Sequence, residues 1–264
     1  MRNSYRDTLR IVLLTRTGRP SGEKILKALV LSKKKVVGVV AEKRSSILLN
    51  KGTYNFFKKS LRLHGYPFLI ARALEFLKGF VGGNKDFLKE FCREHSIPFY
   101  LVDDHNSASS KHILQTLQPD ILISANTRII KGHILNTPAK AAVNFHTSKL
   151  PLYAGLDSIF WALYYGEKEI GVTVHYLAEG LDTGDILSQR TIPVTADDDL
   201  SSLTAKANDI GSQLMVETVE RFENGDFCGT AQDLGRRTYF SWPTSAQRRE
   251  LRRRMMHQVY GKSS

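Results

Sequence analysis

Three polar side chains in one stretch of the sequence have types and a spacing that could stabilise an oxyanion and relay a proton. Asn144 and His146 lie two residues apart at the end of 141–145, an apolar segment that predicts a β-strand. Side chains two apart on a strand share a face, so both should point the same way while Phe145 points into the core. An amide donor beside an imidazole could bind a carbonyl oxygen and stabilise an oxyanion as it forms.

Asp182 follows a second predicted strand, at 171–177, and lies between Gly180 and Gly184. Two glycines so close together indicate a tight turn. A carboxylate in that turn could hold the imidazole in its charged form or relay a proton. Taken singly, a strand-end histidine is more often structural, an aspartate between glycines more often forms a turn, and a strand-end asparagine is usually a cap.

The elements that must position these residues alternate between short apolar strands and amphipathic helices. Strands are expected at 9–14, 36–40, 98–102, 120–124, 141–145, 171–177 and 186–194. Helices are expected after the loop 15–21 and at 86–95, 111–117, 158–165 and 199–223. This alternation predicts an α/β fold with an open, mostly parallel, doubly wound sheet covered on both faces. In such sheets ligands bind outside the carboxyl ends of the strands, which here include the loop 147–155.

Residues 43–84 interrupt this pattern with lysines and arginines interleaved with aromatic residues. We interpret them as a basic helical insertion that packs on the sheet or offers a membrane or partner surface. The chain is therefore divided into a catalytic domain at 1–225, which contains the insertion, and a basic C-terminal extension at 226–264.

Composition constrains the class of protein and its surroundings. The 264 residues carry a net charge of +12, which suits an anionic ligand, nucleic acid or a membrane surface, or merely a well-solvated basic surface. Two cysteines without metal-ligand spacing predict neither a disulfide framework nor a metal site. No apolar run of about 18 residues occurs, and the first residues lack an apolar signal-peptide core, so we expect a cytoplasmic protein.

Three motifs resemble those of one enzyme family, the folate-dependent formyltransferases, which include glycinamide ribonucleotide, methionyl-tRNA and nucleotide-sugar amine formyltransferases. The motifs are Asn144-Phe-His146, Ser148-Lys-Leu-Pro151-Leu-Tyr153-Ala-Gly155 and Leu181-Asp182-Thr-Gly184. The resemblance is densest over 119–194 and absent from 43–84. It implies a Rossmann-like formyltransferase fold. Lys149 and Ala154 depart from the family pattern on the acceptor side of the loop.

The resemblance also implies a reaction and its residues. A formyl group passes from the cosubstrate 10-formyltetrahydrofolate to an amine, with Asn144 and His146 stabilising the oxyanion. Asp182 orients His146 and helps to move the proton, and no metal is needed. The residues assigned to folate are Arg128, Ile130, Leu177, Gly180 and Leu181. The residues assigned to the acceptor are Ser148, Tyr153 and Gly155.

The acceptor is expected to be a small anionic amine, with an amino sugar nucleotide preferred because a diphosphate suits a basic chain. The 82 residues after Asp182 leave no room for the C-terminal barrel of methionyl-tRNA formyltransferases. Formyltetrahydrofolate hydrolysis, and transfer to glycinamide ribonucleotide or aminoacyl-tRNA, are the alternatives within the family. A nucleic-acid-binding protein on an inactive formyltransferase scaffold is the alternative outside it. Nucleic acid is not expected as an obligate partner, whereas peripheral membrane contact and a homodimer are both compatible with the sequence.

Overall fold

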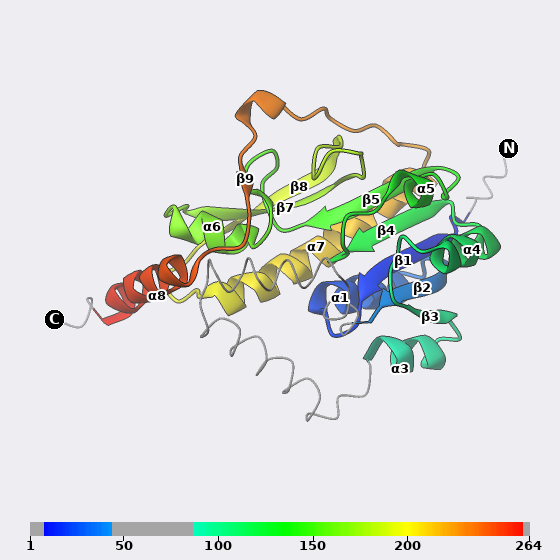
Figure 1. Ribbon diagram of the computed structural model, residues 1–264, viewed down its shortest axis with the longest axis horizontal. Coiled ribbons are helices and arrows are strands. Elements are labelled where there is room, and N and C mark those ends of the chain that lie inside the picture. The colour runs from blue at the N-terminus through cyan, green and yellow to red at the C-terminus, as the bar shows by residue number, and fades with distance from the viewer. Residues whose placement is uncertain (1–7, 44–86, 261–264) are drawn as a thin grey trace, which may run out of the picture.

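One seven-stranded sheet, in the order β3-β2-β1-β4-β5-β7-β8, forms the centre of the molecule (Figure 1). The computed structural model describes residues 8–43 and 87–260, with side chains as far as residue 255. The strands are β1 (Ile11–Arg16), β2 (Val36–Glu42), β3 (Phe99–Val102), β4 (Ile121–Ala125), β5 (Ala141–His146), β7 (Glu169–Tyr176) and β8 (Ile186–Pro193). Two short strands, β6 (Ala154–Gly155) and β9 (Tyr239–Phe240), pair separately.

The described helices connect these strands in the manner of βαβ units. They are α1 (Pro20–Leu31), α3 (Phe87–Glu94), α4 (Ala108–Leu117), α5 (Gly132–Leu135), α6 (Ser158–Tyr164), α7 (Leu200–Glu223) and α8 (Ser245–Tyr260). The longest, α7, begins with a capping box in which Asp199 and Ser202 bond each other's backbone N–H. Gly211 in α7 lies against the ring of Phe145, so the helix packs directly on β5.

Side-chain alternation along the parallel strands divides the core between the two faces of the sheet. In β1, Ile11 and Leu13 belong to a cluster shared with α1, α3 and α7, whereas Val12 and Leu14 belong to one shared with α4 and α5. Both clusters are buried, so the first strands read as continuous apolar runs. The sheet is therefore covered by helices on both sides over β2, β1 and β4.

The other end of the sheet is built differently, because β5, β7 and β8 pair antiparallel. One face of β7 still packs on α7 through its alternate apolar residues. The opposite face carries polar residues, among them Asn144, His146, Thr173 and His175. Loops and the C-terminal segment lie beside these polar residues. In Figure 1 that segment, drawn in orange, arches over β7 and β8 before it descends to β9 and α8.

The predicted fold class and the predicted main strands are confirmed, with β1 shifted two residues towards the C-terminus. Five elements were not predicted: β6, β9, α5, the 3₁₀ helix η2 (Leu234–Arg236) and α8. The first three span only two to four residues, too short for a periodic pattern, and β6 and β9 exist only because they pair with each other. The predicted helical insertion falls on residues 44–86, outside the described part of the chain.

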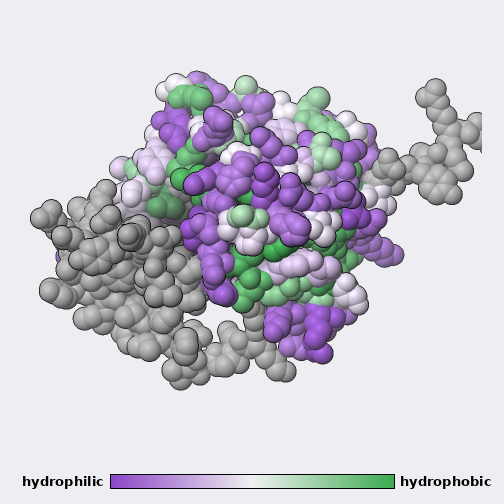
Figure 2. Space-filling model, turned by 45° about the vertical axis from the view of Figure 1, so that its right-hand side comes forward, coloured by the Kyte–Doolittle hydropathy of each residue, from purple (hydrophilic) through white to green (hydrophobic). Residues whose placement is uncertain are grey.

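The face drawn in Figure 2 is largely hydrophilic, with hydrophobic residues in smaller areas between the polar ones. The large exposed apolar side chains come from elements far apart in the sequence, such as Leu31 in α1, Leu101 in β3 and Tyr165 after α6. None of the helices within the described residues is long and apolar enough to cross a bilayer.

Candidate active site

The site begins at the carboxyl end of β5, where alternation separates the polar side chains from the core. Phe145 is buried among apolar residues of the helix-covered face, while Asn144 and His146 lie on the opposite face and are partly exposed. The His146 side chain is 13% exposed, and its Nε2 atom has no hydrogen-bond partner among the described residues. A buried imidazole nitrogen without a partner is free to bind a reacting atom.

Asp182 reaches this strand end from the turn between β7 and β8, as predicted. Its φ of 54° lies in the left-handed region, which aspartate tolerates better than most residues. One carboxylate oxygen, Oδ2, lies 3.8 Å from His146 Nε2 and accepts a hydrogen bond of 2.9 Å from the Gly155 N–H. The carboxylate is only 9% exposed, so its charge acts on the imidazole with little screening by solvent.

His175 is a fourth member of the site. It pairs with Asn144 across the antiparallel strands, is 1% exposed, and has its Nε2 atom 3.2 Å from Asn144 Nδ2. Its Nδ1 lies 2.8 Å from the Tyr176 carbonyl oxygen, which can only accept, so Nδ1 carries the proton. Neutral His175 therefore accepts from Asn144 and fixes which end of that amide donates.

The electrostatic surroundings keep His175 neutral. Burial lowers its pKa most, and the neighbouring His146 lowers it further, against the opposing charge of Asp182, so that the pKa falls to about 4. The two imidazole rings meet edge to face with centroids 6.4 Å apart. The site thus contains neutral His175, which accepts a hydrogen bond from Asn144 and orients it, and His146, whose Nε2 has no hydrogen-bond partner among the described residues.

The expected strand 171–177 contains His175, but strand pairing was needed to give this residue a role. Antiparallel pairing of β5 with β7 places residues 144 and 175 directly opposite each other on one face. The available signal was the alternation of Thr173 and His175 with apolar neighbours. That pattern identifies the polar face of β7 without saying which strand lies beside it.

The residues predicted to bind folate follow β4 and β7, at the same edge of the sheet. Leu177 and Leu181 are partly exposed and Gly180 is exposed, in the turn that carries Asp182. Ile130, in contrast, is 5% exposed and packs in the core cluster beside α4 and α5. Any contribution of Ile130 to folate binding would therefore come from its backbone.

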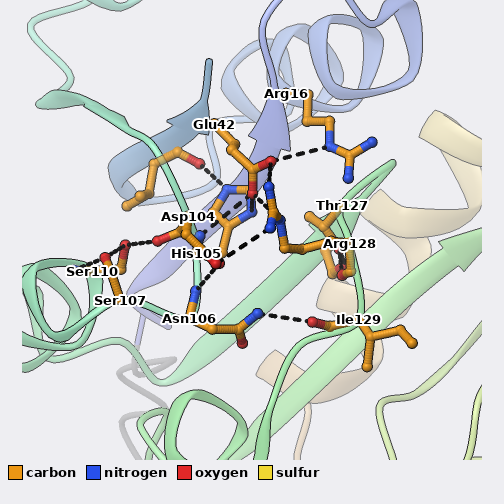
Figure 3. A network of polar contacts seen from close by, with 12 residues as sticks. Arg16, Glu42, Asp104, His105, Asn106, Ser107, Ser110, Thr127, Arg128 and Ile129 are labelled. Atoms are coloured by element: carbon orange, nitrogen blue, oxygen red, sulfur yellow. Dashed lines mark hydrogen bonds and ion pairs between the residues drawn. The ribbon is translucent and has the colours of Figure 1, made fainter. Parts of the chain in front are cut away.

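Arg128, also predicted to bind folate, is part of a polar network at the carboxyl ends of β1, β2 and β4 (Figure 3). Its Nε and Nη2 donate to the two oxygens of Glu42 at 2.7 and 2.5 Å, and Nη1 donates to Asp104 at 3.3 Å. Burial opposes ionisation of Glu42, but hydrogen bonds from His105 and Arg128 and the charges of Arg128 and Arg16 lower its pKa to about 2. The guanidinium of Arg128 is therefore held by acidic partners within the protein.

The residues predicted to bind the acceptor lie around the loop after β5. Ser148 is 3% exposed, and its hydroxyl lines a small cavity together with Tyr153, Glu167 and Glu169. Tyr153 donates to Glu167 at 2.6 Å, and burial together with that carboxylate raises the pKa of its phenol. Gly155, with φ of 97°, donates its N–H to Asp182, so it lies beside the candidate catalytic residues.

Comparison with known proteins agrees with this geometry. The family described as formyl transferase matches residues 89–219. Methionyl-tRNA formyltransferase of Listeria innocua is 34% identical over 153 residues, which cover 58% of this chain and 49% of that protein. The corresponding enzyme of Kosmotoga olearia is 33% identical over the same length. The chain thus spans about half the length of these relatives.

Solved structures share the fold at lower identity. Phosphoribosylglycinamide formyltransferase from Bacillus halodurans superposes with a TM-score of 0.58 at 22% identity, covering 81% of this chain and 94% of that one. WlaRD, a sugar 3N-formyl transferase solved in the presence of dTDP and 5-N-formyl-THF, gives a TM-score of 0.59 at 18% identity, covering 90% and 70%.

Proposed function

We propose that the chain, whose residues 89–219 match the family described as formyl transferase, transfers a formyl group from 10-formyltetrahydrofolate to a primary amine of a small-molecule acceptor. One observation carries this proposal: the open Nε2 of His146 lies 3.8 Å from the Asp182 carboxylate, on the strand face shared with Asn144. A cytoplasmic location, expected from the sequence, is part of the same proposal.

The reaction follows from the donors at the strand end. The neutral amine attacks the formyl carbon, and the carbonyl oxygen gains negative charge as the new C–N bond forms. Asn144 has one N–H engaged by His175, which leaves its second N–H for that oxygen. Protonated His146 supplies the second donor, stabilised by the charge of Asp182.

Proton balance completes the transfer. The attacking amine loses a proton and the departing N10 of the folate gains one when the bond between the formyl carbon and N10 breaks. Asp182 and His146 lie together at the strand end and can pass that proton directly or through water. Most of the rate enhancement then comes from orientation and from stabilisation of the oxyanion, and the nucleophile needs no activation beyond being neutral.

We further propose an anionic acceptor, with a nucleotide-linked amino sugar preferred. Arg16 ends β1 at the same edge of the sheet and adds positive charge there, although its Nε already lies 3.7 Å from the Glu42 carboxylate. The next helix, α1, begins at Pro20, so its N-terminal backbone dipole also favours an anion at this edge. A sugar 3N-formyl transferase solved in the presence of dTDP shares this fold.

Aminoacyl-tRNA is the second candidate acceptor, because the methionyl-tRNA formyltransferase of Listeria innocua is 34% identical to this chain. The C-terminal helix α8 adds Arg249, Arg252 and Arg253 as exposed cations that could contact phosphates. Binding through such contacts should weaken steeply as salt rises. A small nucleotide sugar, held inside the cleft, should show a weaker salt dependence.

The test offers purified protein 10-formyltetrahydrofolate together with nucleotide-linked amino sugars, glycinamide ribonucleotide or methionyl-tRNA in parallel. Release of tetrahydrofolate coupled to a mass gain of one formyl group identifies the acceptor. Asp182→Asn should abolish most of the transfer, because asparagine keeps the turn but removes the charge beside His146. Asp209→Asn, on the outer surface of α7, is the matched control and should transfer at the wild-type rate.

Three results would change the proposal. Release of formate without formylation of any acceptor would indicate a hydrolase. Salt-sensitive RNA binding without loss of the formyl group would favour a nucleic-acid-binding scaffold. Equal activity of Asp182→Asn and wild type would remove this cluster from the mechanism.

A further inference from the structure

The C-terminal segment 230–240, here called the strap, crosses both loops of the candidate active site. It leaves the sheet edge at Thr230, whose N–H and carbonyl oxygen exchange hydrogen bonds of 2.8 Å with Ile186. It ends as β9, which pairs in parallel with β6 in the loop after β5. In Figure 1 the strap is the orange stretch that leads down to β9.

Gln232 in the strap bonds the turn that carries Asp182. Its side-chain nitrogen lies 3.0 Å from the Asp182 carbonyl oxygen and 2.6 Å from that of Gly184. Both partners can only accept, which identifies the amide nitrogen as the donor. The side chain therefore connects the backbone on both sides of Thr183.

A second strap residue, Arg237, holds the residue before the aspartate. Its Nη2 donates to the Leu181 carbonyl oxygen at 2.9 Å. Among the described residues, Gln232 and Arg237 supply every hydrogen bond received by the carbonyl groups of Leu181, Asp182 and Gly184. The turn has no backbone donors of its own for these groups, so the strap determines where its backbone lies.

The strap also holds the other side of the carboxylate. Leu156 donates to the Phe240 carbonyl oxygen and Ala154 donates to that of Thr238, both at 2.9 Å, on either side of Gly155. Gly155 in turn donates to Asp182 Oδ2. The backbone and the carboxylate of Asp182 thus both depend on contacts from one segment.

We propose that Gln232 is a positioning residue for the reaction, which holds Asp182 at the distance from His146 that formyl transfer requires. This inference rests on the proposed function. Asp182 needs such support because no backbone N–H among the described residues bonds the carbonyl groups of Leu181, Asp182 and Gly184. Phe240 at the end of the strap packs on Trp161 in the third hydrophobic cluster, whereas Gln232 belongs to none of the three clusters, so its contacts with the turn are its role in the fold.

The test compares Gln232→Met with Gln247→Met in the full-length chain. Methionine keeps the volume of glutamine and removes the donor. Gln247 is the matched control, because its amide bonds Thr244 at the start of α8, away from the turn. We expect Gln232→Met to lower kcat roughly 10- to 100-fold, as for a misplaced catalytic group. Gln247→Met should retain wild-type kcat.

Coupling to Asp182 distinguishes positioning from general stabilisation. In an Asp182→Asn background, Gln232→Met should lower kcat by less than about twofold, because residues that act as a unit are not additive. The inference would be overturned if the losses in kcat of Asp182→Asn and Gln232→Met multiplied in the double variant. It would also be overturned if Gln232→Met by itself kept the wild-type kcat. Hydrogen–deuterium exchange of the backbone amides of 178–185 tests the same inference without an activity assay. The exchange should be faster in Gln232→Met than in the wild type, and unchanged in Gln247→Met.

The two proposals fail in distinguishable ways. A wild-type protein that transfers no formyl group, but whose turn at 178–185 exchanges faster in Gln232→Met, would sink the proposed function and leave the positioning role supported. Unchanged exchange in that variant would overturn the positioning role even if the wild type transfers formyl groups.

Discussion

His146 combines features that ordinary surface or core histidines lack. Its Nε2 is buried, it lies 3.8 Å from a carboxylate, and no described residue bonds it. Asn144 beside it is oriented by neutral His175, so its amide presents a donor and not an acceptor to the site. Both features prepare the strand end for a developing negative charge, and each can be removed by a single substitution.

Asn144→Ala and His146→Ala should each lower turnover on the order of 10²–10³, the effect of losing one oxyanion donor. Thermal unfolding should change little, because both side chains lie at the edge of the core. His112→Ala, an exposed position on α4, controls for loss of an imidazole as such. Near-wild-type turnover in either active-site variant would exclude that residue from the mechanism.

His175 should affect turnover, because it orients Asn144, and it should also affect the stability of the fold at acid pH. His175→Leu removes the acceptor and should lower kcat about tenfold, while His175→Gln places an oxygen near the lost Nε2 and should recover most of it. The pKa of His175 falls to about 4 in the folded chain, so unfolding takes up a proton between pH 6.5 and about 4. Stability from this group is complete above pH 6.5 and declines as the pH falls through that window.

Both variants remove the titrating imidazole, so each should unfold with a shallower loss of stability between pH 6.5 and 4 than the wild type. Urea unfolding at several pH values measures this slope. A wild-type slope in the variants would mean that another group dominates the titration.

Among the elements, the small sheet of β6 and β9 depends on one glycine. Gly155 has φ of 97°, and a Cβ there would lie 2.3 Å from the Phe240 carbonyl oxygen. An alanine must therefore separate the two strands or move the N–H that Asp182 accepts. This contact explains why the loop after β5 needs glycine at this position.

Gly155→Ala should lower kcat at least about tenfold, because a displaced donor misplaces the carboxylate. Gly166→Ala is the matched control: its φ of 77° is also positive, but a Cβ there meets nothing within 4 Å. It should lower the free energy of unfolding by about 1 kcal/mol and leave turnover unchanged. Equal turnover in the two variants would mean that Gly155→Ala strains the backbone without displacing the N–H that Asp182 accepts, and that the contact with β9 does not affect catalysis.

At the scale of the whole molecule, two halves of one sheet serve different purposes. The parallel half, β3-β2-β1-β4, is packed by helices on both faces and carries the network of Glu42 at its carboxyl edge. The antiparallel half exposes a polar face to loops and the strap, and it holds the catalytic cluster. Glu42 joins the ends of β1 and β2 to Arg128 after β4, so it stabilises the edge on which ligands would rest.

Glu42→Gln should lower the free energy of unfolding by about 3 kcal/mol at neutral pH, because it leaves Arg128 and Arg16 without their buried counter-charge. The pKa of Glu42 falls to about 2, so its stabilisation is complete above pH 4.5 and is lost as the pH falls through 2. The variant should therefore lose less stability than wild type between pH 4.5 and 2. Urea unfolding over that range checks both expectations.

The sequence by itself determined the α/β class and the main strands, and it singled out Asn144, His146 and Asp182 as candidate catalytic residues. These depend on local patterns: apolar runs of strand length, two-residue alternation, and short motifs with fixed spacing. Such patterns need no knowledge of which segments meet. For the same reason they could identify the polar face of β7 without assigning a role to His175.

Only the tertiary structure decided what surrounds those residues. His175 orients Asn144 because β5 and β7 pair antiparallel, Arg128 is held by Glu42 because β2 and β4 flank β1, and Gln232 reaches Asp182 across 50 residues of chain. Each contact joins segments far apart in the sequence, and its energy depends on burial and on geometry that no local pattern contains. The physical reason is that side-chain hydrogen bonds act over about 3 Å in space, whatever the separation along the chain.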